Sequence, residues 1–325
     1  MKNRKIAVIG LGYVGLPLAC ALSKHFEVYG FDTNKKRIKD LENNIDSNDD
    51  LKILKLTKKN IFFTTDEKVL KKANIFIVTV PTPVFKNNLP NLDIINKATV
   101  TIAKYLKKKD FVIYESTVYP GFTDEISIPL LEKKSGLKIN TDFICGYSPE
   151  RINPGDKKRK IENIKKIVSA SNSKGLKEIN YIYKKIIKAG VYKTDNIKIA
   201  EAAKIIENSQ RDINIAFMNE LAVIFNKLNI DTFKVLDAAK TKWNFLNFVP
   251  GLVGGHCIGV DPYYLAYKSK QIGHNPKIIL SGRKINNDMS KFYSDLVIKN
   301  LDNPIKYKKV LILGATFKEN CKDLR

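Results

Sequence analysis

The sequence of 325 residues predicts an α/β protein, with a doubly wound parallel sheet first and a helical region after it. Short apolar runs recur through the first half of the chain, and each is followed by polar residues. Runs of this length are typical of strands that are buried on both faces. The segment from 197 to 228 contains no proline or glycine and repeats apolar residues at helical spacing, which predicts one long helix.

Composition excludes several classes of protein. The four cysteines are widely spaced, which fits neither a disulfide framework nor a zinc site, so a reducing compartment and no metal are expected. The sequence shows no signal peptide and no stretch approaching the ~18 apolar residues of a membrane span, so we expect a cytoplasmic protein without a membrane partner.

The net charge of +24 comes from lysines and arginines in short runs along the whole chain. No basic stripe interleaved with aromatic residues is present, so no nucleic-acid partner is expected. The pattern favours a compositional bias of the source genome and leaves open a role in attracting an anionic ligand.

The first apolar run, residues 5–9, leads into the motif G-x-G-x-x-G. The first glycine makes a tight turn, the second lets a pyrophosphate approach the backbone, and the third lets the following helix pack against the strand. The N-terminus of that helix also favours phosphate. The pattern predicts a dinucleotide-binding Rossmann domain, whose candidate cofactor contacts here are Gly10, Gly12, Tyr13, Val14 and Gly15.

Asp32 follows the next predicted strand, 17 residues after Gly15. A carboxylate there accepts hydrogen bonds from ribose hydroxyls and repels a 2′-phosphate, which favours NAD over NADP. Arg37 is a further candidate cofactor residue, and because an arginine near this point can accommodate the phosphate, it leaves NADP open.

Three later strand ends deliver polar residues to the same edge of the predicted sheet. Ligands of open parallel sheets bind outside the carboxyl ends of the strands, so these turns should line one crevice. They contribute Thr82, then Glu115, Ser116 and Thr117, and finally Ser148, Glu150 and Arg151. Of these, Thr82 and Thr117 are candidate cofactor contacts.

The long predicted helix carries Lys204, Asn208 and Arg211 at spacing i, i+4 and i+7, which places them on one face. Such a trio suits a sugar hydroxyl and an oxyanion, although an ordinary solvated face gives the same pattern. The apolar stripe of the helix predicts either core or a subunit interface.

The stretch PGLVGGHCIGVD, residues 250–261, places Cys257 on a glycine-rich loop. Gly254 and Gly255 allow the backbone to approach a ligand closely. A thiol acts as a nucleophile only as the thiolate, which needs nearby cations or dipoles, and Lys204 is a candidate for that role. His256 is interpreted as mainly structural.

Taken together, the chain resembles the UDP-glucose/GDP-mannose dehydrogenase family, and within it the UDP-N-acetylhexosamine 6-dehydrogenases. The resemblance covers almost the whole chain through the motifs IGLGYVGLP, VPTP, ESTVYPG, YSPERINPGD, AEAAKIIENSQRDINIA, KWNFLNFVPGLVGGHCIGVDPYYL and FKENCKDLR.

The resemblance implies oxidation of the C6 alcohol of a nucleotide sugar to a carboxylate with two NAD⁺, for surface polysaccharide biosynthesis. It implies that Cys257 captures the aldehyde as a thiohemiacetal, which becomes a thioester. Lys204 and Asn208 would serve proton transfer and the oxyanion, and Asp261 would orient the lysine or a water. Glu150 would assist hydrolysis, and Thr117 would lie beside it near the nicotinamide.

The resemblance also implies binding contacts and a homodimer formed through the long helix. The implied substrate contacts are Arg151, Ile152, Lys204, Asn208, Arg211, Lys242, Asn244, Gly254, Phe317 and Lys318, and Arg325 would reach NAD across the interface.

Two positions depart from the UDP-glucose branch of the family. Pro154 stands where that branch has a second glutamate, and Val260 where it has a lysine. These forms imply an acetamido sugar of either the gluco or the galacto configuration, with UDP-glucose as the alternative substrate.

Three domains are expected: 1–196 binding NAD, 197–303 helical with the cysteine loop, and 304–325 as the first strand and loop of an incomplete UDP-binding domain. The run KVLILG repeats the opening KIAVIG and predicts that strand. Two rival readings stay open: an NAD-binding fragment without catalysis, and a β-hydroxyacid dehydrogenase, which needs no cysteine.

Overall fold

A computed structural model describes residues 3–47, 60–152, 159–255, 258–301, 305–314 and 316. The chain forms two compact units, of which the first extends to Ile205 and the second begins at Ile206. The predicted boundary at residue 197 coincides with the start of helix α6 (Ile197–Lys227), which begins in the first unit and continues into the second.

The first unit is built on a sheet to which the described chain contributes eight strands, in the order β3-β2-β1-β4-β5-β6-β7-β8. All neighbours are parallel except β6 and β7. The strand order reverses between β1 and β4, which is where ligands of doubly wound sheets bind. The strands are β1 (Lys5–Ile9), β2 (Glu27–Phe31), β3 (Ile61–Thr64), β4 (Ile75–Val78), β5 (Phe111–Tyr114), β6 (Ile144–Tyr147), β7 (Lys166–Ala170) and β8 (Val191–Lys193).

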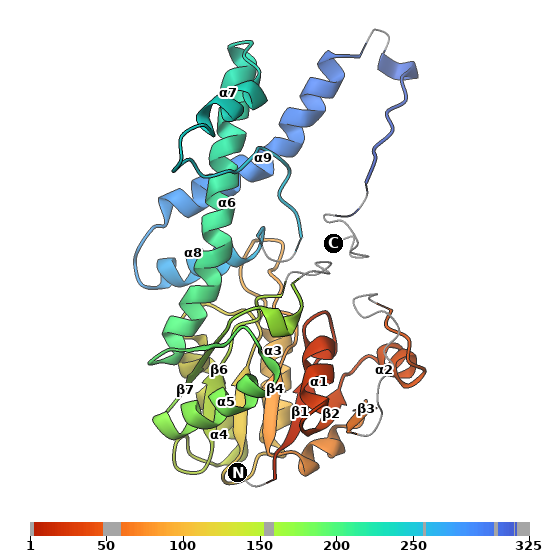
Figure 1. Cartoon of the computed structure of the whole chain (residues 1–325), viewed down its shortest axis with the longest axis vertical. Helices are drawn as coiled ribbons and strands as arrows, with labels where there is room; N and C mark the ends of the chain where they lie inside the picture. Colours follow the sequence, from red (N-terminus) through yellow and green to blue (C-terminus); the bar gives the residue numbers. More distant parts are fainter. Residues whose placement is uncertain are drawn as a thin grey trace. The chain divides into compact units, whose positions relative to one another are not determined.

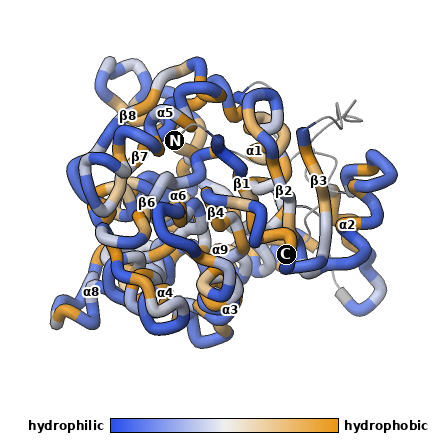
Figure 2. Tube along the Cα trace, turned by 90° about the horizontal axis from the view of Figure 1, so that it is seen from below, coloured by the Kyte–Doolittle hydropathy of each residue, from blue (hydrophilic) through white to orange (hydrophobic). Residues whose placement is uncertain are grey.

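Helices cover both faces of this sheet. Figures 1 and 2 show α1 and α5 on one face and α3 and α4 on the other. The helices of the first unit are α1 (Gly15–Ser23), α2 (Lys35–Glu42), α3 (Asp93–Ala103), α4 (Ile128–Ser135) and α5 (Ser173–Ile186), with short turns η1 (Glu67–Lys72), η2 (Thr123–Ser127) and η3 (Ile161–Asn163).

This double cover explains why the strands are continuous apolar runs rather than alternating ones. Every residue of β4, β5 and β6 is buried, and so are Ile6, Ala7 and Val8 of β1. Burial on both faces leaves no side that favours polar residues. The predicted doubly wound sheet, with polar residues after its strand ends, is confirmed.

The second unit is helical. Besides α6 it contains α7 (Thr232–Ala239), α8 (Asp261–Gln271), α9 (Lys277–Lys299) and the short turn η4 (Ile305–Tyr307). The prediction of one long helix from 197 to 228 is confirmed to within one residue. An irregular segment joins α7 to α8 and carries the glycine-rich loop.

The prediction of a strand at KVLILG is wrong for this structure. Residues 308–314 are irregular, and the side chains from Val310 to Leu313 are between 56% and 85% exposed. A strand is stabilised by hydrogen bonds to a neighbouring strand, and within the described ranges no strand pairs with this run. The apolar pattern alone therefore does not produce the element.

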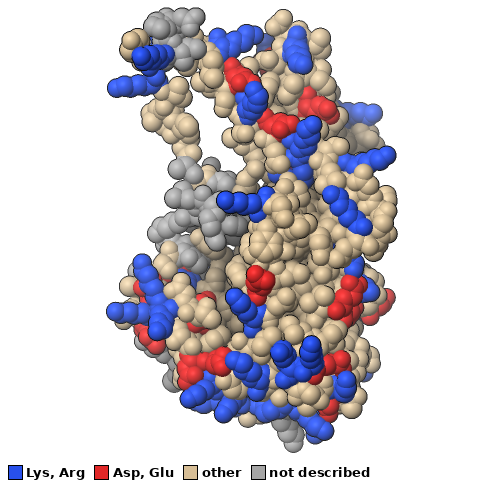
Figure 3. Space-filling model, turned by 180° about the vertical axis from the view of Figure 1, so that it is seen from behind, with Lys and Arg blue, Asp and Glu red and all other residues tan. Residues whose placement is uncertain are grey.

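The surface charge is dispersed. Figure 3 shows lysine and arginine side chains scattered over the visible face and interspersed with acidic ones, without a continuous basic stripe. Of the helices in the described ranges, none combines the length and apolar character needed to cross a membrane.

Candidate active site

The glycine turn after β1 shows different constraints at its three glycines. Gly10 has φ +94, which strongly favours glycine. A Cβ on Gly15 would lie 1.8 Å from the Gly10 carbonyl oxygen, whereas one on Gly12 would meet nothing within 4 Å. The turn is therefore close-packed at Gly15 and open at Gly12, which is the arrangement that a pyrophosphate on the backbone requires.

The residues around this turn support its shape. The Thr79 hydroxyl lies 2.7 Å from the Gly10 carbonyl oxygen and ties the turn to the end of β4. Tyr13 and Val14 lead into α1 and are half-buried. Sequence reasoning missed Thr79, although it follows directly after an apolar run.

Asp32, at the end of β2, lies beside the glycine turn. Its Oδ2 accepts a hydrogen bond from the Leu11 amide at 2.7 Å, and its Oδ1 accepts one from the Asn34 amide at 2.8 Å. A carboxylate offers about four acceptor sites, so each oxygen can accept a further bond from a ribose hydroxyl. The turn and Asp32 together fit NAD.

Arg37 is buried against the same turn. Its Nε donates to the Leu11 carbonyl at 2.9 Å, and its Nη1 pairs with Asp46 at 2.7 Å and reaches the Ser47 hydroxyl at 3.1 Å. These contacts hold the guanidinium as a brace for the turn. We therefore expect Arg37 to support the NAD site rather than receive a 2′-phosphate.

The turns after β4 and β5 are joined to each other. The Thr82 hydroxyl donates to the Thr117 carbonyl at 2.6 Å, and the Ser116 hydroxyl donates to the Val80 carbonyl at 2.6 Å. Because β4 lies between β1 and β5, both turns belong to the sheet edge that carries the glycine turn. The structure thus brings Thr82 and Thr117 together as the sequence predicted.

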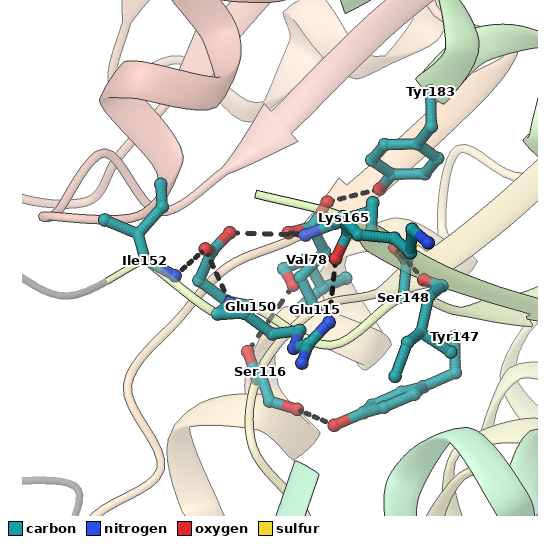
Figure 4. A network of polar contacts seen from close by, with 12 residues as sticks. Val78, Glu115, Ser116, Tyr147, Ser148, Glu150, Ile152, Lys165 and Tyr183 are labelled. Atoms are coloured by element: carbon teal, nitrogen blue, oxygen red, sulfur yellow. Dashed lines mark hydrogen bonds and ion pairs between the residues drawn. The ribbon is translucent and has the colours of Figure 1, made fainter. Parts of the chain in front are cut away.

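Glu150, after β6, is held by a buried polar network. Its Oε1 accepts the amides of Arg151 at 2.7 Å and Ile152 at 2.5 Å, and its Oε2 lies 3.2 Å from Lys166 Nζ. The same Nζ lies 2.6 Å from Glu115 Oε2. Figure 4 shows Glu150, Glu115 and Tyr183 within one connected network.

Burial and charge act in opposite directions in this network. Burial opposes the ionisation of Glu150, but Lys166 and the two amides outweigh it and hold the pKa of Glu150 below its usual value. Burial raises the pKa of Glu115 to about 7 against the opposing effect of Lys166. Burial disfavours the ammonium of Lys166, yet the two carboxylates raise its pKa above the usual value.

Two neighbouring residues predicted to contact substrate have contacts inside the first unit. Arg151 Nη1 donates to the Lys165 carbonyl at 2.8 Å. Ile152 is half-buried and packs against the hydrophobic core. Their predicted role in substrate binding stays a prediction.

The predicted trio on α6 divides by burial. Lys204 and Asn208 are buried, whereas Arg211 is exposed. A missed residue, Glu201, lies on the same helix within the first unit. Its carboxylate accepts the Gly121 amide at 2.6 Å and the Thr123 amide at 2.9 Å, so it fixes the start of α6 to the loop after β5.

Within the second unit, two predicted catalytic residues lie in direct contact. The Asn208 amide nitrogen donates to Asp261 Oδ2 at 2.5 Å, although the residues are 53 positions apart. Asp261 is the first residue of α8 and is 3% exposed. Asn208 and Asp261 therefore form one buried pair at the end of the glycine-rich loop.

The beginning of that loop is fixed by Asn219, which sequence reasoning also missed. The Asn219 side chain accepts the Gly251 amide at 2.8 Å and donates to the Gly251 carbonyl at 3.0 Å. It further donates to Asn286 of α9 at 2.8 Å. Behind it, Arg283 pairs with Asp212 at 2.6 Å. A buried polar network thus connects α6 and α9 to the loop.

The remaining predicted residues fall into two groups. Lys242, Asn244 and Gly254 are exposed on the irregular segment between α7 and α8. The second group lies outside the described residues: Cys257, His256, Phe317, Lys318 and Arg325. Within the described part of the chain, no three His, Cys, Asp or Glu residues are grouped so that they could hold a metal ion.

Comparison with known proteins matches two successive parts of the chain to two domains of one enzyme family. Residues 4–187 match the NAD binding domain of the UDP-glucose/GDP-mannose dehydrogenase family, and residues 198–288 match its central domain. The chain is 54% identical to a UDP-N-acetyl-D-glucosamine 6-dehydrogenase of Salmonella typhi, over 99% of this chain and 76% of that protein. It is also 54% identical to the protein of the same name from Pseudomonas aeruginosa, over 100% and 78%.

Among solved structures, the chain is similar to the UDP-N-acetyl-mannosamine dehydrogenase Cap5O of Staphylococcus aureus. The TM-score is 0.85 at 29% identity, and the match covers 99% of this chain and 76% of that one. The glycine turn with Asp32, the matched domains and these relatives agree. The chain belongs to the UDP-glucose/GDP-mannose dehydrogenase family and is an NAD-dependent nucleotide-sugar dehydrogenase.

Proposed function

We propose that this enzyme oxidises the C6 hydroxyl of a UDP-N-acetylhexosamine to the carboxylate, in two steps of two electrons each. The observation that carries the proposal is the buried Asn208–Asp261 pair, because it joins α6 to the end of the loop that bears Cys257. The substrate class is supported by the two relatives at 54% identity, both named UDP-N-acetyl-D-glucosamine 6-dehydrogenase.

In the proposed first oxidation, the sugar alcohol loses its hydroxyl proton and a hydride, leaving the C6 aldehyde. When bound, NAD⁺ supplies the hydride acceptor for both oxidations, and the glycine turn with Asp32 would hold it. Lys204 would accept the hydroxyl proton and stabilise the negative charge that develops on the alcohol oxygen, with Asn208 as a second donor to that oxygen. Asp261 holds the Asn208 amide group and so fixes its orientation.

In the second oxidation, the Cys257 thiolate would add to the aldehyde carbon and form a thiohemiacetal. Loss of a second hydride and of the hydroxyl proton would leave a thioester at that carbon. Covalent capture explains why a thiol is needed, because it keeps the aldehyde in the site until it is oxidised again.

Hydrolysis would then break the bond between sulfur and C6, releasing the carboxylate and regenerating the thiol. Glu150 would orient the attacking water, with Thr117 nearby at the same sheet edge. The two amides and Lys166 that contact Glu150 support this role, because they keep it as a carboxylate ready to accept a hydrogen bond.

We further propose that Arg151, Ile152, Arg211, Lys242, Asn244 and Gly254 contact the nucleotide sugar, together with Phe317 and Lys318. UDP-glucose is the alternative substrate. The same proposal includes the three domains predicted from the sequence. It also includes a cytoplasmic location and a role in surface polysaccharide synthesis.

The proposed assembly is a homodimer through α6. Apolar residues on one face of this helix, together with Leu228 directly after its end, are exposed by 44% to 59% in the single chain: Ile199, Ile206, Phe217, Ile224 and Leu228. Their spacing brings them onto one stripe. Burying such a stripe against a second copy would remove it from water, which supports the dimer.

The test is NADH formation with UDP-GlcNAc, UDP-GalNAc and UDP-glucose, compared between the wild type and Cys257→Ser. We expect two NADH for each acetamido sugar, and a steady-state rate lower by about 100-fold or more in the variant, because the aldehyde is no longer captured. Cys20→Ala is the matched control, since this thiol lies in α1 and should leave the rate unchanged.

A variant that retains the wild-type rate would contradict the thiol mechanism and favour a β-hydroxyacid type of reaction. If UDP-glucose were the preferred substrate, the proposed branch would be wrong. If NAD bound and no nucleotide sugar were oxidised, this chain would be a cofactor-binding fragment.

A further inference from the structure

Glu150 belongs to a network of two carboxylates and one ammonium, contributed by Glu150, Glu115 and Lys166. Their side chains lie almost wholly inside the first unit. The side chain of Glu115 is 0% exposed, that of Lys166 is 3% and that of Glu150 is 10%. Isolated charges at such depth are costly, so their arrangement needs an explanation. Glu150 is the member of this trio that reaches the surface.

Within the described residues, the hydrogen bonds to Glu150 occupy three of its acceptor sites and leave one. A carboxylate has about four acceptor sites. Oε1 uses two of them for the amides of Arg151 and Ile152, and Oε2 uses one for Lys166. The remaining acceptor site is on Oε2, the oxygen that Lys166 contacts and holds in position.

Lys166 is in turn fixed from behind. Glu115 accepts from its Nζ at 2.6 Å, and the Tyr183 hydroxyl donates to the other oxygen of Glu115. These groups come from separate elements: Lys166 begins β7, Glu115 follows β5 and Tyr183 lies on α5. Without Glu115, the ammonium would be paired with Glu150 alone and would lose its fixed position.

We propose that Lys166, held by Glu115 and Tyr183, is a positioning residue that keeps Glu150 ionised and aims its Oε2 at the water that hydrolyses the thioester. This inference rests on the proposed function, since it assigns Glu150 to that step. Lys166 touches neither substrate nor cofactor in this proposal and acts through Glu150.

The proposal predicts the direction of a change with pH. The charged and titratable groups that face Glu150 in the described chain are Lys166 and, behind it, Glu115 and Tyr183, while Arg151 shares its loop. Lys166 favours the carboxylate, so its removal must raise the pKa of Glu150. Activity that needs the carboxylate would then be lost at a higher pH than in the wild type.

The test variant is Lys166→Met with Glu115→Gln. Replacing Lys166 alone would leave two carboxylates side by side in the interior and risk unfolding, whereas the double replacement removes one charge of each sign. Lys166→Arg keeps the cation and should rescue the function at least in part. Ile167→Val is the matched control, because it trims the next side chain of β7, which points to the opposite face of the sheet.

The first measurement is an infrared titration of Glu150, identified by the signal missing in Glu150→Gln. The second is the pH profile of kcat for NADH formation between about pH 5 and 8, with KM for the nucleotide sugar. We expect the double variant to move both the Glu150 titration and the acidic limb of kcat upward by about one pH unit or more, while KM stays within about twofold.

An unchanged titration would overturn the proposal, and so would an unchanged kcat profile in an active enzyme. If kcat of the double variant fell no more than kcat of Ile167→Val, and its pH profile did not shift, Lys166 would have a structural role. That result would overturn the proposal as well. If the wild type oxidised no nucleotide sugar, the proposed function would fail by itself, and the infrared titration would still decide whether Lys166 holds the charge of Glu150.

Discussion

Two glycines of the same motif serve different physical purposes. At Gly15 the space for a side chain is occupied by the Gly10 carbonyl oxygen and the Thr79 hydroxyl, at 1.8 and 2.5 Å from a hypothetical Cβ. At Gly12 that space is empty. Gly15 is therefore required by the fold of the turn, whereas Gly12 leaves open space that we expect the pyrophosphate of NAD to approach.

Replacing each glycine by alanine should separate these purposes. Gly15→Ala should destabilise the first unit by about 1–3 kcal/mol or more, because the clash is with backbone that cannot move freely. Gly12→Ala should keep the wild-type melting temperature and weaken NAD binding at least about tenfold, since the methyl group occupies the path of the pyrophosphate. Thermal unfolding and calorimetric titration with NAD measure the two effects.

Each variant is the control for the other. A Gly12→Ala protein that binds NAD as tightly as the wild type would show that the pyrophosphate does not approach this turn. Unchanged stability of Gly15→Ala would show that the close packing of α1 on the turn can relax.

Helix α6 holds loops in place through polar residues on its buried side. In the first unit Glu201 binds the loop after β5, and in the second Asn208 binds Asp261 and Asn219 binds Gly251. Each side chain satisfies groups that would otherwise lack partners away from water. The helix therefore fixes the two ends of the glycine-rich loop, at Gly251 and at Asp261.

Asn219→Ala should release the first of these ends. The amide and the carbonyl of Gly251 would both lose their partner, so we expect the free energy of unfolding to fall by about 2–4 kcal/mol. The Gly251 amide should also exchange its hydrogen faster, and kcat should fall more than NAD affinity. Hydrogen exchange and thermal unfolding are the measurements.

Asn214→Ala is the matched control, since within the described residues the Asn214 side chain donates just to the Gln210 carbonyl, on the surface of the same helix. It should change stability by no more than about 0.5 kcal/mol. Equal effects of the two substitutions would mean that Asn219 contributes nothing specific to the loop.

For the molecule as a whole, the apolar stripe of α6 predicts self-association. Phe217 and Leu228 are 53% and 59% exposed in the single chain and lie on the same side of the helix. Phe217→Asp with Leu228→Asp should place two like charges on each copy within the proposed interface and raise the dimer dissociation constant at least about 100-fold. Sedimentation equilibrium measures it.

Asn226→Asp adds a charge to the opposite side of α6 and should leave the dimer intact. A wild-type protein that stays monomeric at high concentration would contradict the proposed assembly. A double variant that still dimerises would locate the interface elsewhere.

Features that depend on local pattern could be predicted from the sequence. The glycine motif, the polar residues after β4, β5 and β6, and the extent of α6 all follow from the spacing of nearby residues, and the structure confirms the strands and the helix. Local pattern was insufficient for 308–314, where an apolar run needs a partner strand to become a strand.

Contacts between distant residues could not be predicted. Lys166 is one of many lysines in the sequence, and nothing near it indicates that its side chain is 3% exposed and its ammonium lies between two carboxylates. The hydrogen bond from Asn208 to Asp261 likewise depends on how α8 packs on α6. Arg37 was predicted beside the cofactor, and only its contacts with Leu11 and Asp46 reveal it as a brace.

The buried trio of Glu115, Lys166 and Glu150 also limits how this enzyme can change over evolutionary time. Loss of Lys166 alone leaves two carboxylates without a cation in the interior, so it should be rejected more often than a paired change that also removes Glu115. Among related enzymes, a neutral residue at position 166 should therefore be found together with a neutral residue at position 115.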